Sequence, residues 1–554
     1  MSSKAQAKTS RSIQGVVPGV VLAFVGEIAV AEDGVRAVAG NGTGVVTGDG
    51  RSITDFGRDD VGGSEGEGGD DEDEDGWMWR KKTMAATICF EPKRYGHLDP
   101  LLGSDLFYSF IRSIGRGDAL QFAQSLFDRY SNTFIAAVFG RTILNTMDPK
   151  NIQVVLSDTE LFSAAQVRQE ALEPLMGRAI WTTDGPDWSR SRSLIKPIVN
   201  KAHSPSYSAS FYAHVQHLLD HVPRDGSTVD LQPLFQSFVS ELTHLPPYTM
   251  SEFIFGKSTD TLTEGKENEI FDVEQFMTSL QRALQACGTR IFMGRFSFLL
   301  GPASSMKKSC KRVHNALDNL IEEALQNRNK GGVSTTFLDK LMESTQDRVE
   351  LRYQVLHVFL PGYDSDAVGL SQIFFQLARN PDVWRKLREE ILVLDQSRTL
   401  TFEDVRSLKY LNFRLLAPFG MNIRRCTRST TLPSGGGPTG TSPITIRAGT
   451  EINMVCLLTQ KDPSIWGADA ADFQPKRWQD PDLKPSAYEY MPFSAGKRAC
   501  PGQQMALSEC SYVSARFVQE FAGMECRDEE RRFVEEQRMA MQSRNGVKVA
   551  FSVT

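Results

Sequence analysis

From about residue 92 onward, apolar residues recur every three or four positions along stretches that polar turns separate. That spacing places apolar side chains on one face of an α-helix. It predicts helices over residues 211–222, 337–345, 351–380 and 382–394. Strand-type runs are few and short, at 442–458 and 546–553. The pattern therefore predicts a mainly α fold with small β-sheets.

The N-terminal part of the chain has a different residue composition. Its first 76 residues hold 16 of the 44 glycines and end in the acidic run 70–75. Such a segment has too little apolar side-chain area to offset the entropy lost on ordering. We expect residues 1–85 to be disordered, as a solvated tail or, alternatively, as an acidic arm for a basic partner. Residues 92–554 contain no internal repeat or second linker, which predicts one large domain.

One apolar run, GVVPGVVLAFV at residues 15–25, precedes the acidic segment. A helix needs about 20 apolar residues to cross a bilayer, and this run ends at Glu27. A degenerate signal or anchor is the alternative interpretation. The sequence shows no clear transmembrane helix.

Composition and cysteine spacing exclude several classes of protein. The chain of 554 residues has 40% hydrophobic and 23% charged residues and a net charge of −6, without the basic surplus typical of nucleic-acid binding. Its eight cysteines are dispersed and form no CxxC pair. This pattern argues against a disulfide framework and a zinc ribbon.

One cysteine stands in an unusual loop, MPFSAGKRACPGQQMALSE at residues 491–509. Phe493, Gly496, Arg498, Cys500 and Gly502 form the spacing F-x-x-G-x-R-x-C-x-G before a helical pattern. The positive end of a helix dipole stabilises a thiolate. The glycines allow tight turns and a close approach to a flat ligand, and the arginine can bind a carboxylate on it.

A thiolate without histidine or cysteine partners is a poor zinc site, but it suits an iron whose other ligands come from a porphyrin. The loop resembles the haem-binding signature of the cytochrome P-450 monooxygenases, and the resemblance extends over roughly residues 95 to 553. It implies a single haem domain, haem as the cofactor, and Cys500 as the axial ligand of the haem iron. A chance cysteine loop is the alternative.

Two further stretches match the family. Trp188 and Arg192, in GPDWSRSR, match the W-x-x-x-R of a helix that caps a haem propionate. FQPKRW, at 473–478, resembles the "PERF" segment and places Arg477 in a structural ion-pair cluster. Taken alone, Trp188 could equally be a core aromatic and Arg192 a solvated cation.

The long helix predicted at 351–380 contains PGYDSD, where the family has A/G-G-x-D/E-T. The resemblance implies that Asp364 and Ser365 are catalytic residues that relay protons during dioxygen reduction. Pro361 lacks an N–H and so leaves the carbonyl of His357 free to open a groove in the helix. A pair on the helix surface is the alternative interpretation.

Several stretches look most like the alkane and fatty-acid hydroxylase branch of microsomal P-450s, namely residues 229–238, 376–391 and 430–443. This similarity implies a long hydrophobic substrate, O2, NADPH-cytochrome P-450 reductase as electron donor, and association with the endoplasmic reticulum membrane. Lys497, Arg190, Arg192 and Lys196 are candidates for the reductase docking face.

The sequence departs from the family at two places. Leu411 replaces the glutamate of the family's E-x-x-R before Arg414, and Pro246 with Pro247 interrupts the pattern of 240–256. A proline inside a helix costs about 3 kcal/mol, so the pair predicts a loop. These departures favour, as an alternative, an inactive or vestigial haem-binding protein.

A third alternative is a haem-thiolate enzyme that rearranges or dehydrates an oxygenated substrate without using dioxygen. Such an enzyme has no need of a relay that delivers protons to reduced oxygen. The retained Asp364 and Ser365 therefore argue against it.

Overall fold

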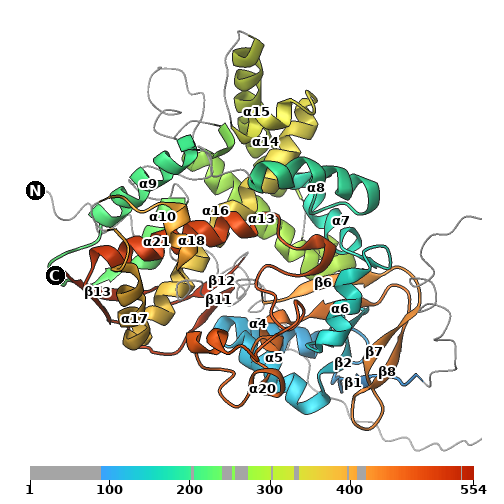
Figure 1. The fold of residues 1–554 in the computed structure, drawn as a ribbon. Coiled ribbons are helices and arrows are strands. Elements are labelled where there is room, and N and C mark those ends of the chain that lie inside the picture. Colours follow the sequence, from blue (N-terminus) through green and yellow to red (C-terminus); the bar gives the residue numbers. More distant parts are fainter. Residues whose placement is uncertain are drawn as a thin grey trace, which may run out of the picture. The chain divides into compact units, whose positions relative to one another are not determined.

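The computed structural model describes residues 89–200, 205–239, 253–255, 273–300, 303–329, 336–395, 398–408, 420–537 and 540–553, all within one compact unit, Cys89–Thr554 (Figure 1). The predictions for residues 1–85, for Pro246 and Pro247, and for Leu411 and Arg414 lie outside the described residues. The domain limits predicted from the sequence stay predictions.

Helices dominate the described part of the chain, which confirms the mainly α prediction. Their bounds are α4 Ser104–Arg116, α5 Ala119–Tyr130, α6 Pro149–Ser157, α7 Ala165–Met176, α8 Gly185–Asn200, α9 Pro205–Asp220, α10 Leu231–Val239, α13 Val273–Met293, α14 Ser304–Asn329, α15 Phe337–Met342, α16 Arg348–Arg379, α17 Pro381–Ile391, α18 Phe402–Ser407, α19 Cys456–Thr459, α20 Pro463–Trp466 and α21 Gln503–Glu520. The helices expected at 211–222, 337–345, 351–380 and 382–394 are α9, α15, α16 and α17.

The strands form small sheets. The largest has the order β1-β2-β3-β9-β6-β4, with bounds Lys93–Arg94, Thr133–Val138, Arg141–Thr146, Glu451–Met454, Asn422–Cys426 and Phe162–Ser163. The others are β10-β13-β5 (Gly523–Cys526, Lys548–Ser552, Val229–Asp230), β11-β12 (Glu535–Gln537, Met541–Ser543) and β7-β8 (Thr430–Gly436, Ser442–Ile446). The largest sheet joins the β2–β3 hairpin to β9, far later in the chain, with Ile143 opposite Glu451.

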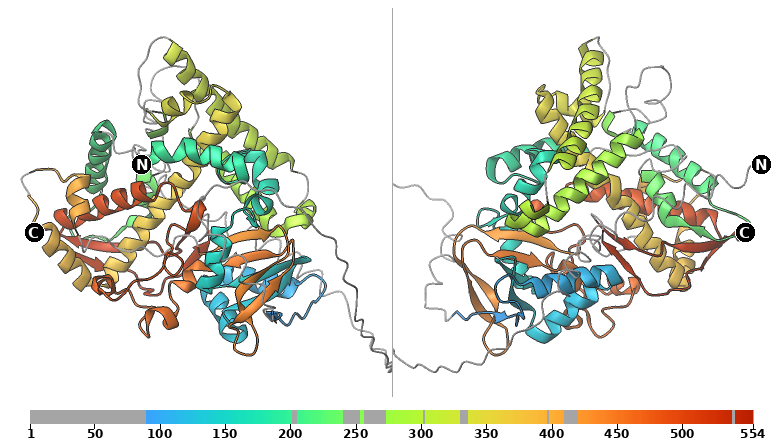
Figure 2. Two further views of the ribbon diagram at one scale, coloured as in Figure 1. Left: turned by 45° about the vertical axis from the view of Figure 1, so that its right-hand side comes forward. Right: turned by 180° about the vertical axis from the view of Figure 1, so that it is seen from behind.

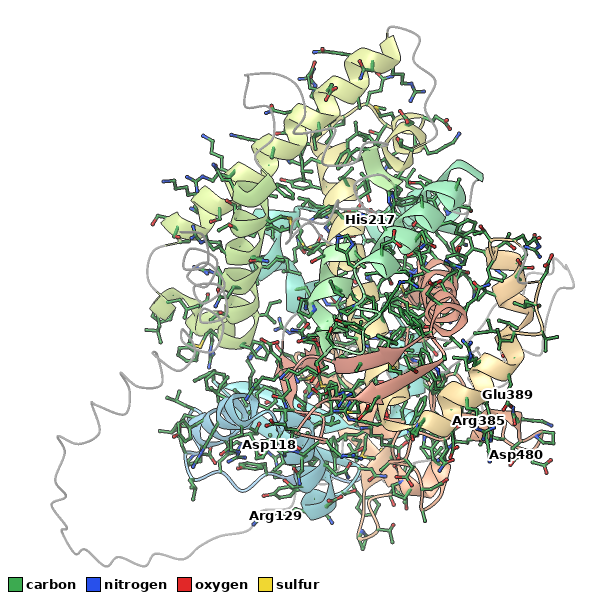
Figure 3. All side chains as sticks on the ribbon, turned by 90° about the vertical axis from the view of Figure 1, so that its left-hand side faces the viewer. Asp118, Arg129, His217, Arg385, Glu389 and Asp480 are labelled. Carbon is green, nitrogen blue, oxygen red and sulfur yellow. The ribbon has the colours of Figure 1, made fainter. Side chains whose placement is uncertain are left out.

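Helix α17 shows how the sequence pattern becomes structure. Its apolar residues Val383, Trp384, Leu387 and Ile391 are buried, and its first residue, Pro381, needs no intrahelical partner for a backbone N–H. On the outer face, Arg385 pairs with Glu389 across one turn at 2.7 Å (Figure 3). Surface pairs of this kind contribute little, about 0.3–0.5 kcal/mol, so burial of the apolar face holds the helix in place.

The main core lies around α16 and α21, the two helices that carry the candidate site residues. Phe374 of α16 contacts Phe517 of α21 with ring centroids 4.8 Å apart, and Tyr512 stacks on Tyr212 of α9 at 4.4 Å. The six-stranded sheet lies at one end of the unit and α14 and α15 at the other (Figure 2). The two central helices therefore position the site from a rigid core.

Candidate haem-thiolate site

The backbone of the Cys500 loop is fixed by its own hydrogen bonds. The N–H of Cys500 donates to the carbonyl of Phe493 at 3.0 Å, and the loop passes through a short 3₁₀ turn, Gly496–Arg498, before α21. Gly496 has φ of +71°, and a Cβ there would lie 2.4 Å from the carbonyl oxygen of Leu156. Only glycine fits at this position, which explains one fixed position of the sequence motif.

The thiol of Cys500 differs from the other described thiols. Cys287, Cys310, Cys426, Cys456 and Cys510 are buried, whereas Cys500 is exposed. Withdrawal from water nevertheless raises its pKa, while the backbone N–H of Gly502 and the guanidinium of Arg192 act to lower that pKa. A thiol that is accessible, partly desolvated and close to a cation can bind a metal.

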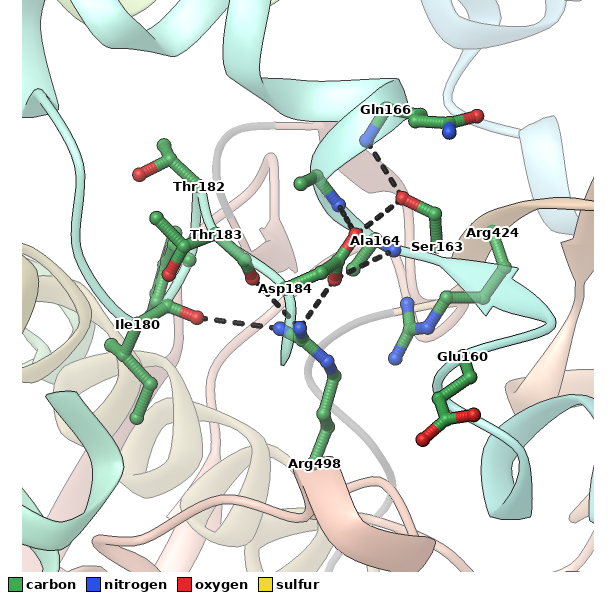
Figure 4. Close-up of polar contacts among 12 residues, drawn as sticks. Glu160, Ser163, Ala164, Gln166, Ile180, Thr182, Thr183, Asp184, Arg424 and Arg498 are labelled. Atoms are coloured by element: carbon green, nitrogen blue, oxygen red, sulfur yellow. Dashed lines mark hydrogen bonds and ion pairs between the residues drawn. The ribbon is translucent and has the colours of Figure 1, made fainter. Parts of the chain in front are cut away.

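Arg498 crosses from the Cys500 loop to the segment before α8 (Figure 4). Its guanidinium pairs with Asp184 and donates to the carbonyl of Thr183 at 2.7 Å. Asp184 also accepts hydrogen bonds from Ser163 and from the backbone of Ala165. This carboxylate therefore joins the Cys500 loop to the beginning of α7.

The predicted partners Trp188 and Arg192 lie beside the same loop. The Nη1 of Arg192 donates to the carbonyl of Ala499 at 2.9 Å. The guanidinium carbons of Arg192 and Arg498 lie 5.7 and 4.7 Å from the ring centroid of Trp188. Cation–π contacts of this kind hold cations in place where water is scarce. The fold thus brings Trp188, Arg192, Arg498 and Cys500 together, and their roles toward a cofactor stay predictions.

Two further arginines at this site, Arg168 and Arg424, were not predicted from the sequence. Arg424, on β6, is 3% exposed and donates to the carbonyl of Ile423, and no dashed line joins it to another residue in Figure 4. Burial, together with the nearby Arg168 and Arg498, lowers the pKa of Arg424 to about 9. Its signal in the sequence was an arginine at the strand position whose neighbour two residues on, Cys426, faces inward.

Four arginines thus gather around the Cys500 loop: Arg168, Arg192, Arg424 and Arg498. Among the described residues, Asp184 is the one carboxylate that acts electrostatically on any of them. Desolvation lowers the pKa of each arginine. Because buried cations without counter-ions are unfavourable, this arrangement suits a ligand that carries more than one negative charge.

On α16, the helix continues through Pro361, and the hydroxyl of Ser365 donates to the carbonyl of Pro361 at 2.6 Å. Asp364 is half-buried. The imidazole of His357, one turn earlier, accepts from the N–H of Trp181 and contacts the carbonyl of Met176 at 3.0 Å. Burial lowers the pKa of His357 to about 3, so this imidazole is neutral and ties α16 to the segment before α8.

Arg477 lies in a 3₁₀ turn, Pro475–Gln479. It donates to the carbonyls of Trp466 and Asp469 and pairs with the carboxylate of Asp469 at 3.1 Å. Leu411 and Arg414, the positions that match the family's E-x-x-R, lie outside the described residues, so the predicted ion-pair cluster stays a prediction.

The site thus belongs to a mainly helical protein with an exposed cysteine thiol among buried and partly buried arginines. Comparison with known proteins agrees. The sequence profile of the family described as Cytochrome P450 matches residues 101–551. Cytochrome P450 52A13 of Debaryomyces hansenii is 34% identical over 458 residues, covering 76% of this chain and 84% of that protein. The chain belongs to the cytochrome P450 family.

Two other relatives have a similar sequence identity to this chain. Cytochrome P450 52A3-A of Candida maltosa is 32% identical over 462 residues, which cover 77% of this chain and 85% of the relative. Cytochrome P450 monooxygenase iccC of Talaromyces variabilis is 30% identical over 485 residues, 84% and 92% of the two chains. The protein is therefore an oxidoreductase that incorporates oxygen from O2, and its cofactor is haem bound through a cysteine thiolate.

The described residues fit this cofactor. Haem brings two propionates, and the buried arginines lack the anions that would balance them. The Nε of Arg498 is buried without a hydrogen-bond partner in the described structure. Cys500, the most exposed of the described cysteines, supplies a sulfur that a porphyrin-bound iron can use.

Replacing Arg424 by Met should change the haem-free and haem-loaded proteins in opposite directions. Without haem, removal of a buried cation should raise the free energy of unfolding by about 1–3 kcal/mol. In the haem-loaded protein, loss of the Arg424 cation should speed the transfer of haem from this protein to an excess of apomyoglobin, because one cation fewer balances the propionates. The measurements are urea unfolding of the haem-free chain and the transfer rate.

The matched control is Arg425→Met, because Arg425 pairs with buried Glu451 at 2.6 Å. It should destabilise the haem-free chain, since it leaves the buried carboxylate of Glu451 with Arg141 as its remaining cation. If Arg424→Met also destabilised the haem-free chain and left haem transfer unchanged, the unbalanced-cation interpretation would be wrong.

Proposed function

We propose that this P450 inserts one oxygen atom into a long, alkane- or fatty-acid-like substrate, with Cys500 as the axial ligand of its haem iron. The observation that carries the ligand assignment is the accessible thiol of Cys500 among buried, unbalanced arginines. The similarity to relatives named as 52A cytochromes and the sequence stretches of the hydroxylase branch support the substrate class.

Each residue of the site has a distinct task in this proposal. Arg192, Arg424 and Arg498 bind and orient the propionates, and Trp188 packs on two of those guanidiniums. Gly496 lets the loop pack against the carbonyl of Leu156, the carbonyl of Phe493 accepts the N–H of Cys500, and the N–H of Gly502 stabilises the thiolate. When bound, the haem supplies the redox chemistry by which dioxygen is reduced and one oxygen atom reaches the substrate.

The relay on α16 delivers protons in this proposal. The hydroxyl of Ser365 donates to the carbonyl of Pro361 and keeps lone pairs that can accept a hydrogen bond from water. Asp364, on the same turn and half-buried, can exchange protons with solvent. The Oγ of Ser365 would thus accept a hydrogen bond from a water molecule and hold that water as the proton donor for dioxygen reduction.

NADPH-cytochrome P-450 reductase is the proposed electron donor. Of the four cations suggested by the sequence, Lys196 and Lys497 are exposed and free to meet an acidic partner. Arg190 is held by Glu350 at 2.9 Å, and Arg192 donates into the Cys500 loop. Lys497 lies in the Cys500 loop and Lys196 on α8, whose Arg192 contacts that loop, so these two lysines are the better docking candidates.

The proposed attachment to the endoplasmic reticulum membrane involves an apolar surface rather than a helix that spans it. No helix in the described ranges is both long and apolar enough to cross a bilayer. Exposed apolar side chains lie before α4, at the end of α13 and in the 3₁₀ segment Gly294–Leu300. We call these residues the apolar patch: Leu98, Leu101, Leu102, Phe292, Phe298 and Leu299.

Contacts join the two halves of the apolar patch. Phe139, at the turn of the β2–β3 hairpin, donates its N–H to the carbonyl of Leu102 at 2.5 Å. Its ring lies 4.7 Å from that of Phe107 and 5.8 Å from that of Phe296. Contiguous apolar surface of this kind marks a site of association with membranes or proteins.

The Cys500 assignment predicts a spectroscopic result. Cys500→Ala should abolish the thiolate-type Soret band of the reduced, carbon-monoxide-bound protein, because no other sulfur replaces it. The matched control, Cys526→Ala, removes another thiol that is partly accessible and should leave the band unchanged. An unaltered band in Cys500→Ala would refute the assignment.

The relay predicts a change in coupling. Ser365→Ala should bind haem and a fatty acid normally but release several-fold more hydrogen peroxide per NADPH consumed, because the hydroxyl no longer holds the proton donor. The measurement is peroxide and product formation with the reductase present. Equal coupling in variant and parent would exclude this role for Ser365. A parent protein that consumes no NADPH with its reductase and substrate would instead support the vestigial alternative.

The apolar patch predicts weaker vesicle binding when it is made polar. The double variant Phe298→Ser/Leu299→Ser removes side chains that are 70% and 55% exposed. Each loses about 1.5–3 kcal/mol of burial in the membrane, so binding to phosphatidylcholine vesicles should fall about tenfold or more. Leu392→Ser/Val393→Ser, at an exposed site on the end of α17, is the control and should bind like the parent. If both double variants lost the same fraction of vesicle binding, membrane association would not be localised to the apolar patch.

A further inference from the structure

One long segment of the chain carries cations and no carboxylates. Residues 275–317 contain no aspartate or glutamate, although the whole chain has a net charge of −6. The cations of this segment are three arginines, at 282, 290 and 295, followed by Lys307, Lys308, Lys311 and Arg312. The segment comprises most of α13, the 3₁₀ segment Gly294–Leu300 and the first half of α14 (Figure 1). It is therefore a basic region in an acidic protein.

Four of these cations lie together on α14, and we call them the basic stripe: Lys307, Lys308, Lys311 and Arg312. Positions that are three or four residues apart are neighbours on a helix surface, so this spacing places the four on one face. All four residues are exposed. The opposite face of α14, with Cys310 and Val313, is buried in a hydrophobic cluster. The basic stripe therefore faces away from the core.

The acidic residues of α14 do not neutralise the basic stripe. Asp318 and Glu322 lie farther along the helix, and each pairs at 2.6 Å with an arginine of α16, Arg352 and Arg348 respectively. Within the described ranges, none of the four stripe residues forms an ion pair. The positive charges of the stripe are therefore available to a partner.

The basic stripe begins close to the apolar patch. Leu300, which ends the 3₁₀ segment, and Ser304, which begins α14, are four residues apart, and such a chain spans at most about 14 Å. Lys307 follows Ser304 by less than one helical turn, a rise of about 5 Å. Lys307 therefore lies within about 20 Å of the 3₁₀ segment that holds Phe298 and Leu299 of the patch.

Neighbouring apolar and cationic side chains suit the surface of an anionic bilayer. Apolar side chains enter the boundary of the acyl chains, while lysine and arginine keep their charges among the headgroups. A partner that was merely acidic would satisfy the cations but would not cover Phe298 and Leu299, which are 70% and 55% exposed. The combination of the two surfaces therefore favours an anionic lipid bilayer over an acidic protein.

We propose that the basic stripe and the apolar patch together bind bilayers that contain anionic phospholipids, and that the stripe contacts the anionic headgroups. The inference rests on the proposed membrane attachment through the apolar patch and adds the class of lipid that the protein selects. The apolar side chains provide insertion, and the cations of α14 provide the lipid preference.

Removal of charge tests the basic stripe in the full-length, haem-loaded protein. Lys307→Gln/Lys311→Gln removes two cations that lie one turn apart on α14. Vesicle sedimentation at low salt should show that the parent binds phosphatidylcholine vesicles with about one third phosphatidylserine about tenfold or more tightly than pure phosphatidylcholine vesicles. The variant should lose about tenfold of this gain, because each basic residue near an anionic surface contributes about fivefold. Its binding to pure phosphatidylcholine should equal that of the parent.

Two control variants match this change. Lys150→Gln/Lys484→Gln removes two exposed cations that lie outside the stripe, and it should bind both kinds of vesicle like the parent. Lys307→Arg/Lys311→Arg keeps the charges and should keep the preference for anionic vesicles. Salt at about 1 M, where the Debye length is about 3 Å, should abolish the preference of the parent.

Three results would overturn the proposal. Equal affinity of the parent for the two kinds of vesicle would exclude selection of anionic lipids. An equal loss in the stripe variant and in Lys150→Gln/Lys484→Gln would assign the preference to net charge rather than to the stripe. Binding of a soluble polyglutamate peptide by the parent, without any preference for anionic vesicles, would indicate an acidic protein as the partner.

The same measurements separate this inference from the proposed attachment through the apolar patch. Phe298→Ser/Leu299→Ser should weaken binding to both kinds of vesicle, whereas the stripe variant should weaken binding to the anionic vesicles alone. If Phe298→Ser/Leu299→Ser left binding to pure phosphatidylcholine unchanged, attachment through the apolar patch would fail. A loss of anionic preference in the stripe variant would then still establish the contribution of the basic stripe.

Discussion

The ion pair between Arg498 and Asp184 holds the candidate site together. It links the Cys500 loop to the segment before α8, and the same carboxylate accepts hydrogen bonds from the beginning of α7. A single carboxylate cannot balance Arg168, Arg192, Arg424 and Arg498, so the haem-free protein keeps an excess of positive charge in a region poor in water. In our proposal the cofactor's propionates complete this electrostatic arrangement, and haem thereby contributes to the stability of the fold.

The two central helices divide the remaining tasks. α16 carries the hydroxyl of Ser365, and α21 follows the cysteine ligand candidate, Cys500. Their contact through Phe374 and Phe517 fixes the distance between the two sides of the site.

The sequence predicted those features that depend on local spacing. The helix expected at 351–380 is observed at Arg348–Arg379, and the glycine at 496 is required by a positive φ and a close carbonyl. The stretch 442–458 was read as strand-like, yet it contains β8, β9 and the short helix Cys456–Thr459. A short apolar run does not distinguish a strand from a buried helical turn.

Features that depend on distant contacts were not predictable in this way. Asp184 and Arg498 lie 314 positions apart, and the local sequence around either residue does not predict its contact with the other. Arg424 likewise becomes visible as part of the site once strands and helices far apart in the chain are brought together. Local chemistry identified the cysteine; the tertiary structure identified what surrounds it.

The most direct test of the central claim is to compare the binding of haem and of its dimethyl ester to the haem-free chain by Soret titration. The ester keeps the iron and the porphyrin but lacks the two negative charges. The account predicts that the dissociation constant of the ester is at least a hundredfold higher than that of haem, because the buried arginines stay unbalanced. Equal affinities would show that these cations do not serve the propionates.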